Sequence, residues 1–268
     1  MFLPKFLTLV IFFLHSTTAQ EVENETEFDY MKGSEKGPTH WGDLKKEWRE
    51  CKNGKMQSPI DLSRHNVRMV SGLGKLKKNY KAQNASITNR GHDIALTWKK
   101  DAGSININGT KFFLSQCHWH SPSEHTINGR RYDLELHMVH ESPNKNLTNN
   151  IAVIGLLFKI GLPDPTLSKF SKFIKAIANE KAEKNIGIID PSEIKLGGKK
   201  YYRYMGSLTV PPCTEGVIWS INKKIRSVSR KQVKLLRDAV HDHAEKNARP
   251  IQPLNRRGIQ LYDPKHKK

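Results

Sequence analysis

Alternating apolar and polar residues recur along the chain and predict β-strands more often than helices. Residues 133–140 alternate most clearly, so a strand there would carry different side chains on its two faces. Residues 104–114 alternate on both sides of Asn108-Gly109, a dipeptide typical of a two-residue hairpin turn. Residues 151–160 form a nearly continuous apolar run, which predicts a central buried strand.

Helical spacing of apolar residues is confined to two segments. One covers residues 167–177, and the other covers residues 229–243. Ser229 and Gln232 have the spacing of a capping box, which predicts that the second helix begins there. We expect both helices to pack on the sheet and to hold no chemistry.

Histidines lie both in residues 116–120 and in the predicted strand at 133–140. His118 and His120 lie two residues apart, so an extended strand projects both side chains from one face. In the second strand, His137 shares a face with Glu135 and Val139. If the two strands are neighbours in a sheet, three imidazoles converge around one point.

Three neutral imidazoles with an open fourth position are the ligand set of a catalytic zinc ion, whereas a structural site has four protein ligands. Gln116 shares the face of His118, and Glu135 that of His137, so each can hold the second ring nitrogen of a ligand. Cys117 points the opposite way, which favours a small buried apolar residue. The competing interpretation is that such histidines are half buried with ordinary hydrogen bonds.

The histidine pair, the second histidine strand and the intervening Ser-Glu-His-Thr at 123–126 together resemble the signature of the α-class carbonic anhydrases. Residues 206–212, Gly-Ser-Leu-Thr-Val-Pro-Pro, resemble the second signature of that family. The similarity extends from about Phe28 to Tyr262, and it is strongest to plant members of the secretory pathway.

The resemblance implies a mainly β (α+β) single domain with a large, mostly antiparallel twisted central β-sheet and short peripheral helices. The domain would cover residues 20–268, with a core at about 28–262 and a frayed basic C-terminal tail. The implied reaction is the zinc-dependent reversible hydration of carbon dioxide to bicarbonate and a proton. Zinc-bound hydroxide would be the nucleophile, with one Zn²⁺ per chain held by His118, His120 and His137.

The resemblance also assigns roles to residues around the metal. Thr209 matches the gatekeeper that accepts a hydrogen bond from the hydroxide, and Glu124 matches the carboxylate that orients Thr209. His92 matches the proton shuttle, a role suited to a group whose pKa is near 6.5. Asn247 matches a residue whose backbone carbonyl holds His120, and Tyr30 one that orders water.

An apolar wall for carbon dioxide is implied as well, and its members are Val139, Val153, Leu208, Thr209, Val210, Val217 and Trp219. Three positions depart from the common pattern of the family. Arg90 and Ala95 stand where asparagines commonly line the water chain, and Val210 stands where threonine is common. We expect Arg90 to disfavour the imidazolium form of His92 and so to affect proton transfer.

The N-terminus predicts entry into the secretory pathway. Residues 1–19 have the basic Lys5, a short apolar run and a small-residue cleavage site typical of a signal peptide. No apolar stretch is long enough to span a bilayer. The predicted location is extracellular or apoplastic, with the chloroplast stroma reached through the secretory route as the alternative.

Sequons and cysteines agree with that compartment. The sequons predict glycosylation at Asn24, Asn84, Asn108 and Asn146. Three cysteines allow three pairings, and spacing alone does not choose among them. The resemblance, together with the orientation of Cys117, implies a disulfide between Cys51 and Cys213.

The chain is strongly basic, with a formal net charge of +19. Its lysines and arginines are scattered and form no basic helix or nucleic-acid-binding motif, so no specific nucleic-acid partner is expected. The scattered charge favours an ordinary solvated surface, and a weak association with an acidic matrix is the alternative. The resemblance also implies binding of sulfonamide-type inhibitors. The alternative function is that of a catalytically weak storage or polyanion-binding glycoprotein on the same scaffold.

Overall fold

The computed structural model describes residues 27–144, 146–178, 182–240 and 244–266. The predicted signal peptide at 1–19 and the sequon at Asn24 lie outside the described residues. The other three sequon asparagines, Asn84, Asn108 and Asn146, are exposed.

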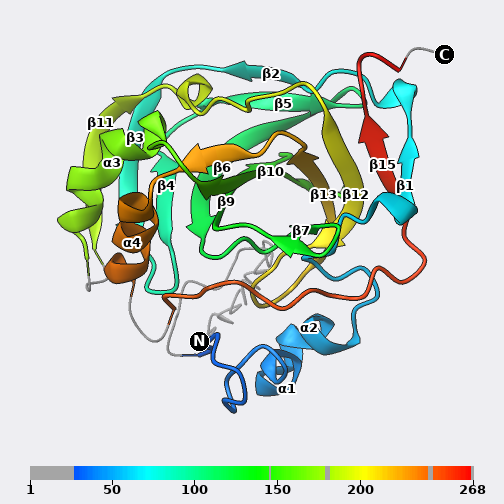
Figure 1. Cartoon of the computed structure of the whole chain (residues 1–268), viewed down its shortest axis with the longest axis horizontal. Helices are drawn as coiled ribbons and strands as arrows, with labels where there is room; N and C mark the ends of the chain where they lie inside the picture. The colour runs from blue at the N-terminus through cyan, green and yellow to red at the C-terminus, as the bar shows by residue number, and fades with distance from the viewer. Residues whose placement is uncertain (1–26, 145, 179–181, 241–243, 267–268) are drawn as a thin grey trace, which may run out of the picture.

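A sheet of thirteen strands is the main element of the described chain (Figure 1). Its strands are β1 (Val67–Met69), β2 (Lys77–Tyr80), β3 (Gln83–Asn89), β4 (Ile94–Trp98), β5 (Gly103–Ile107), β6 (Thr110–His120), β9 (Leu134–Glu141), β10 (Ile151–Ile160), β11 (Glu183–Ile189), β12 (Tyr201–Ser207), β13 (Glu215–Asn222), β14 (Arg226–Val228) and β15 (Ile259–Tyr262). A separate small sheet pairs β7 (Thr126–Ile127) with β8 (Arg130–Arg131).

The main path through the sheet runs β1-β15-β12-β13-β10-β9-β6-β4-β3-β11. Most neighbouring strands are antiparallel, and the parallel pairs are β1 with β15, β10 with β13 and β10 with β14. The predicted fold class, a mainly β domain around a mostly antiparallel sheet, is therefore confirmed.

Short helices surround the sheet. They are α1 (Trp41–Leu44), α2 (Glu50–Asn53), α3 (Pro165–Lys175), α4 (Arg230–Ala239) and the 3₁₀ helices η1 (Lys46–Trp48), η2 (Arg64–Asn66), η3 (Ser71–Leu73) and η4 (Pro191–Glu193). In Figure 1, α3 and α4 lie together beside β3, β4 and β11, whereas α1 and α2 lie apart from them near the start of the described chain.

The local predictions agree with these elements. Asn108 and Gly109 have φ angles of 50° and 87°, the left-handed conformation that a two-residue hairpin turn requires, and they join β5 to β6. The predicted central strand is β10, and Ser229 and Gln232 form both bonds of the capping box of α4. The second helix was predicted to reach His243, but α4 ends at Ala239 and residues 241–243 lie outside the described residues.

A bulge in β6 decides which side chains face which side of the sheet. Leu114 pairs with His140 while Gln116 pairs with Val139, so β6 carries one extra residue between these two pairs. Leu114 and Cys117 therefore both lie in the larger apolar cluster, although a regular strand would place them on opposite faces. Because of the bulge, the side chains of Gln116, His118 and His120 project from the other face of the sheet.

Two apolar clusters cover the two faces of the sheet. The larger cluster includes Leu96, Cys117 and Ile154 and extends to α3 and α4. The second includes Val153 and Trp219, whose neighbours along the strands belong to the opposite face. Since Val153 pairs with Val139 and Gly155 pairs with His137, the second cluster lies on the face of the histidines.

The predicted disulfide is present. Cys51 and Cys213 are bonded and lie in a third apolar cluster with Phe28, Trp41 and other buried residues. Cys117 is a buried free cysteine, as its orientation in the strand predicted. Among the described residues, no helix combines the length and apolar character that crossing a membrane requires.

A buried histidine outside the metal site joins three strands. His140 donates from Nδ1 to the Ala152 carbonyl oxygen, at 3.2 Å, because a carbonyl can only accept. Its Nε2 lies 2.8 Å from the Tyr80 hydroxyl and therefore accepts in this tautomer. Burial lowers the pKa of His140 to about 4, so the neutral form is the one that the fold stabilises.

We predict that this histidine makes the fold acid-sensitive. An unfolded chain binds a proton at His140 below a pKa of about 6.5, whereas the folded chain resists protonation down to about 4. Stability is therefore lost as the pH falls through this interval, by about 3 kcal/mol. Denaturant unfolding of the unaltered chain and His140→Gln across this range measures the effect. The difference between their unfolding free energies should shrink toward acid, and a constant difference would contradict the prediction.

Candidate metal centre

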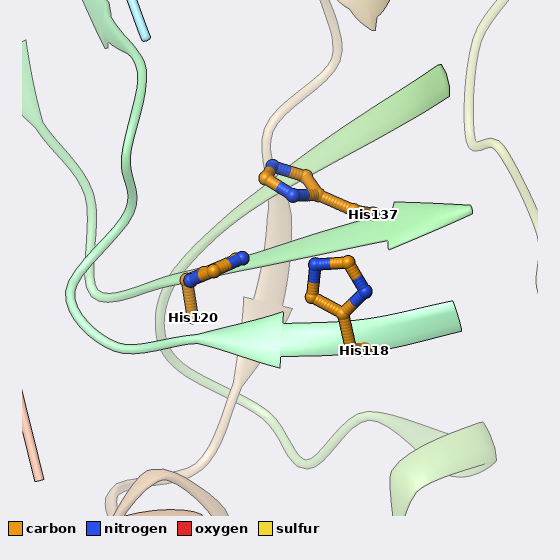
Figure 2. A group of neighbouring side chains, drawn as sticks. All are labelled: His118, His120 and His137. Atoms are coloured by element: carbon orange, nitrogen blue, oxygen red, sulfur yellow. The ribbon is translucent and has the colours of Figure 1, made fainter. Parts of the chain in front are cut away.

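Three histidines from two neighbouring strands meet on one face of the sheet (Figure 2). His118 and His120 project from β6, and His137 projects from β9, where it is the direct cross-strand partner of His118. Their ring centroids are 4.9, 5.1 and 4.6 Å apart, and one nitrogen from each lies within 4.8 Å of the others. All three side chains are buried. The predicted pairing of the two histidine strands is thus present.

Each imidazole is held through its other nitrogen. Nδ1 of His118 lies 2.9 Å from Gln116 Oε1, and Nδ1 of His120 lies 2.8 Å from the Asn247 carbonyl oxygen. His137 uses the opposite nitrogen, since its Nε2 lies 2.9 Å from Glu135 Oε1. These acceptors fix the tautomers and leave Nε2 of His118, Nε2 of His120 and Nδ1 of His137 for a metal.

The donor set fits a zinc ion. His120 Nε2 is buried without a hydrogen-bond partner among the described residues, a costly arrangement unless the nitrogen has another ligand. Burial lowers the pKa of both His118 and His137, which favours the neutral imidazoles that metal binding needs. At His120 burial also lowers the pKa, but Glu124 and other neighbouring acceptors outweigh it and raise the pKa overall.

Glu135 connects the metal site to the surrounding chain. Its Oε2 accepts the backbone N–H groups of Glu124 and His125, both at 2.8 Å. Its Oε1 lies 2.7 Å from His125 Nδ1, besides its contact with His137. Burial alone would raise the pKa of Glu135, but His125 and His137 hold it well below the usual range. The buried carboxylate is therefore charged and fully used as an acceptor.

Sequence reasoning gave no role to three members of this network, His125, Tyr204 and Ser58. His125 continues it through Nε2, which lies 2.6 Å from the Tyr204 hydroxyl, and Tyr204 in turn lies 2.9 Å from Ser58 Oγ. The grouping of His125, Glu135 and His137 also has metal-like spacing. Since these atoms already bond one another, the group is a hydrogen-bonded support rather than a second metal site. The signal for His125 was its place in the Ser-Glu-His-Thr segment.

Glu124 and Thr209 are both buried, but no hydrogen bond joins them among the described residues. Glu124 Oε1 accepts the backbone N–H of Arg249 at 2.9 Å, while its Oε2 lies 3.6 Å from His120 Nε2 and has no hydrogen-bond partner. The expected bond from Thr209 is therefore not formed in this structure. Arg249, to which sequence reasoning gave no role, also donates to Gln57 and to the Cys51 carbonyl oxygen.

His92 lies in a more enclosed place than the family role suggests. Only 3% of it is exposed, and its ring centroid is 5.3 Å from that of Phe28. Arg90 was expected to repel an imidazolium here. Instead, Arg90 binds Asp93 through two contacts of 2.7 and 2.5 Å, and Asp93 lies 3.6 Å from His92 Nε2. The carboxylate offsets the charge of Arg90.

Tyr30 lies near the same corner, where its ring packs against Phe28 and Trp41. Ala95 is buried on β4 and pairs directly with His118, so the position assigned to the water chain adjoins the metal site.

The residues assigned to the apolar wall divide between two clusters. Val139, Val153, Leu208, Val217 and Trp219 share the cluster on the histidine face, and the Trp219 ring centroid lies 4.8 Å from that of His137. Val210 instead belongs to the cluster around the disulfide. Its replacement of threonine therefore places the Val210 methyl groups against Cys213 and its neighbours.

We predict that Glu135→Gln weakens metal binding by about 10- to 100-fold. The carboxylate accepts four hydrogen bonds, and an amide of the same shape can present only one oxygen. The loss is measured by competition for zinc against a chelator of known affinity. Glu141→Gln, at the exposed end of the same strand, is the matched control and should keep full affinity. Equal affinity of the two variants would show that the network does not support the metal ligands.

The sequence is similar to a known protein family over most of its length. The model described as eukaryotic-type carbonic anhydrase matches residues 36–263. Alpha carbonic anhydrase 7 of Arabidopsis thaliana is 57% identical over 245 residues, covering 91% of this chain and 88% of the relative. Carbonic anhydrase Nec1 of Nesocodon mauritianus is 53% identical over 263 residues, covering 98% of this chain and 95% of the relative.

Solved structures agree with this family. A dioscorin complexed with ascorbate has a TM-score of 0.85 at 45% identity and covers 88% of this chain and 98% of its own. An alpha-carbonic anhydrase from Thermovibrio ammonificans, in complex with the inhibitor sulfanilamide, has a TM-score of 0.77 at 36% identity and covers 87% and 98%. The match of the family model to most of the chain, on the fold and histidine cluster described above, shows that this chain belongs to the eukaryotic-type, or alpha, carbonic anhydrases.

Proposed function

We propose that this chain catalyses the reversible hydration of carbon dioxide to bicarbonate and a proton, with one Zn²⁺ per chain. The observation that carries the proposal is the convergence of His118, His120 and His137, each held through its second nitrogen. A zinc ion bound there supplies a Lewis acid that lowers the pKa of water to about 7, as the α-class enzymes themselves exemplify.

Orientation of the nucleophile and binding of carbon dioxide are assigned to side chains near the metal site. Thr209 would accept a hydrogen bond from the nucleophile and donate its own proton to Glu124, whose Oε2 has no hydrogen-bond partner among the described residues. The neighbouring apolar side chains, which include Val139, Val217 and Trp219, would admit carbon dioxide and exclude water from its position.

A second candidate is a catalytically weak storage or polyanion-binding glycoprotein on the same scaffold. The dioscorin neighbour supports it, because that protein was solved with ascorbate bound. The missing bond between Glu124 and Thr209 also favours it, since an unoriented nucleophile would slow hydration. The intact histidine set favours the enzyme.

Stopped-flow hydration of carbon dioxide by the secreted, oxidised protein tests the two candidates, with bound zinc measured in the same preparation. We expect one zinc per chain, and we expect His118→Ala to lose the metal and reduce hydration by more than about a hundredfold. His140→Gln, which changes a buried histidine outside the metal set, should retain zinc. Stoichiometric zinc without hydration would overturn the enzyme in favour of the binding protein.

We propose His92 as the proton shuttle. Its side chain is nearly buried, so a direct test of this role is needed. His92→Ala should lower kcat in dilute buffer by about 10- to 100-fold, because the product proton then lacks a relay. Concentrated imidazole buffer should restore the rate. His65→Ala, at an exposed histidine on η2, is the matched control. An unchanged kcat in dilute buffer would exclude His92 from this role.

We further propose entry into the secretory pathway, with glycans on the exposed Asn84, Asn108 and Asn146 and also on Asn24. The destination would be the apoplast or, alternatively, the chloroplast stroma. Sulfonamides would bind the metal site, as supported by the complex of the Thermovibrio relative with sulfanilamide. The net charge supports a weak association with an acidic matrix.

A further inference from the structure

Three hollows that share lining residues are here together called the basic groove. The central hollow has a volume of about 340 Å³ and lies between the start of β2, the segment before β12, and β10, β12 and β13. The second hollow, of about 370 Å³, shares Gly198 and Lys199 with the first. The third, of about 310 Å³, shares Lys195 with the first. The second and third hollows are therefore both neighbours of the central one.

The basic groove lies on the opposite face of the sheet from the metal centre. Its floor includes Ile154 and Ser220, which are paired across β10 and β13. The adjacent residues along these strands, Val153 and Trp219, belong to the cluster on the histidine face. Because side chains alternate along a strand, the sheet itself separates the groove from the metal ligands.

Lysine dominates the lining. It supplies four of the twelve residues of the central hollow and five of the seven residues of the second. Carboxylates neutralise only part of this charge: the ion pairs are Lys169 with Glu193, Lys200 with Asp263 and Arg226 with Asp164. Among the described residues, no carboxylate forms an ion pair with Lys75, Lys78, Lys195, Lys199, Lys223 or Lys224.

The central lysines are close enough to act on one another. Partial burial lowers the pKa of Lys78, and the positive charges of Lys195 and Lys75 lower it further, against a smaller opposing effect of Asp190. Like charges held together in this way repel, and a bound anion would relieve the repulsion. The apolar floor below them, Leu76, Ile154 and Leu196, keeps the charged groups along the rim.

We propose that the basic groove binds a linear acidic polysaccharide, whose carboxylates would pair with the lysines that line it. A linear occupant fits because unpaired lysines among the described residues line two hollows that share Gly198 and Lys199, whereas a compact anion would neutralise the charge of only one hollow. Among the described lining residues, Tyr201 is the aromatic one, and only 4% of it is exposed. Base stacking, on which proteins that bind single-stranded nucleic acid depend, is therefore not provided.

The proposal is tested by titrating the full, oxidised protein with a long oligogalacturonate and measuring its affinity at several salt concentrations. The variant Lys78→Gln, Lys195→Gln, Lys199→Gln should bind about tenfold more weakly at low salt, with a shallower dependence on salt, since fewer counterions are exchanged. Carbon dioxide hydration should stay unchanged, so failure of this proposal is distinguishable from failure of the proposed enzyme.

The matched control is Lys100→Gln, Lys111→Gln, Lys231→Gln, which removes the same charge from exposed lysines outside the groove. It should keep its affinity. An equal loss in both variants would mean that net charge alone drives binding and would overturn the proposal. Equally tight binding of monomeric galacturonate would replace it with a compact anion site, and equally tight binding of a single-stranded oligonucleotide would replace it with a nucleic-acid surface.

Discussion

The register between β6 and β9 is the constraint on which the metal centre depends. His118 and His137 are direct partners, and a slip of one residue would turn His137 away from the other two ligands. The bulge between Leu114 and Gln116 allows this register to coexist with a well-packed core. On its hairpin side β6 buries Phe112 and Leu114, and after the bulge the core side is taken over by Cys117 and Trp119. The ligand histidines then share the opposite face with Gln116.

Buried charge is arranged around this strand pair in a consistent way. Glu135 is held in its ionised form by two backbone N–H groups and two imidazoles, so its negative charge is available to orient His137. Asp93, whose pKa burial would raise but Arg90 holds well below its usual range, forms a similar buried pair near His92. A buried carboxylate without such partners would take up a proton and lose its orienting role. Glu135 thus holds His137 in one orientation, while the neutral acceptors Gln116 Oε1 and the Asn247 carbonyl oxygen hold His118 and His120.

The two proposed functions lie on opposite faces of the sheet. The histidine face holds the metal ligands and an apolar wall suited to a small apolar substrate. The opposite face holds the larger core and, beyond its edge, the basic groove. A ligand in the groove would therefore hold the protein in place without occupying the catalytic side. The disulfide from Cys51 to Cys213 joins the N-terminal helices to the segment that carries Thr209, and Arg249 donates to the Cys51 carbonyl oxygen.

The sequence by itself determined the strands at 104–114, 133–140 and 151–160, the hairpin at Asn108-Gly109, the helix cap at Ser229 and the common face of His118 and His120. These features depend on neighbouring residues. The sequence also showed the resemblance to the family, and this resemblance identified the disulfide partner of Cys51. Only the tertiary structure decided the bulge in β6, the link from Glu135 through His125 to Tyr204, and the pairing of Arg90 with Asp93. The same holds for the basic groove, whose lysines are scattered along the chain. Such features arise where residues distant in sequence approach one another, and no local periodicity records that approach.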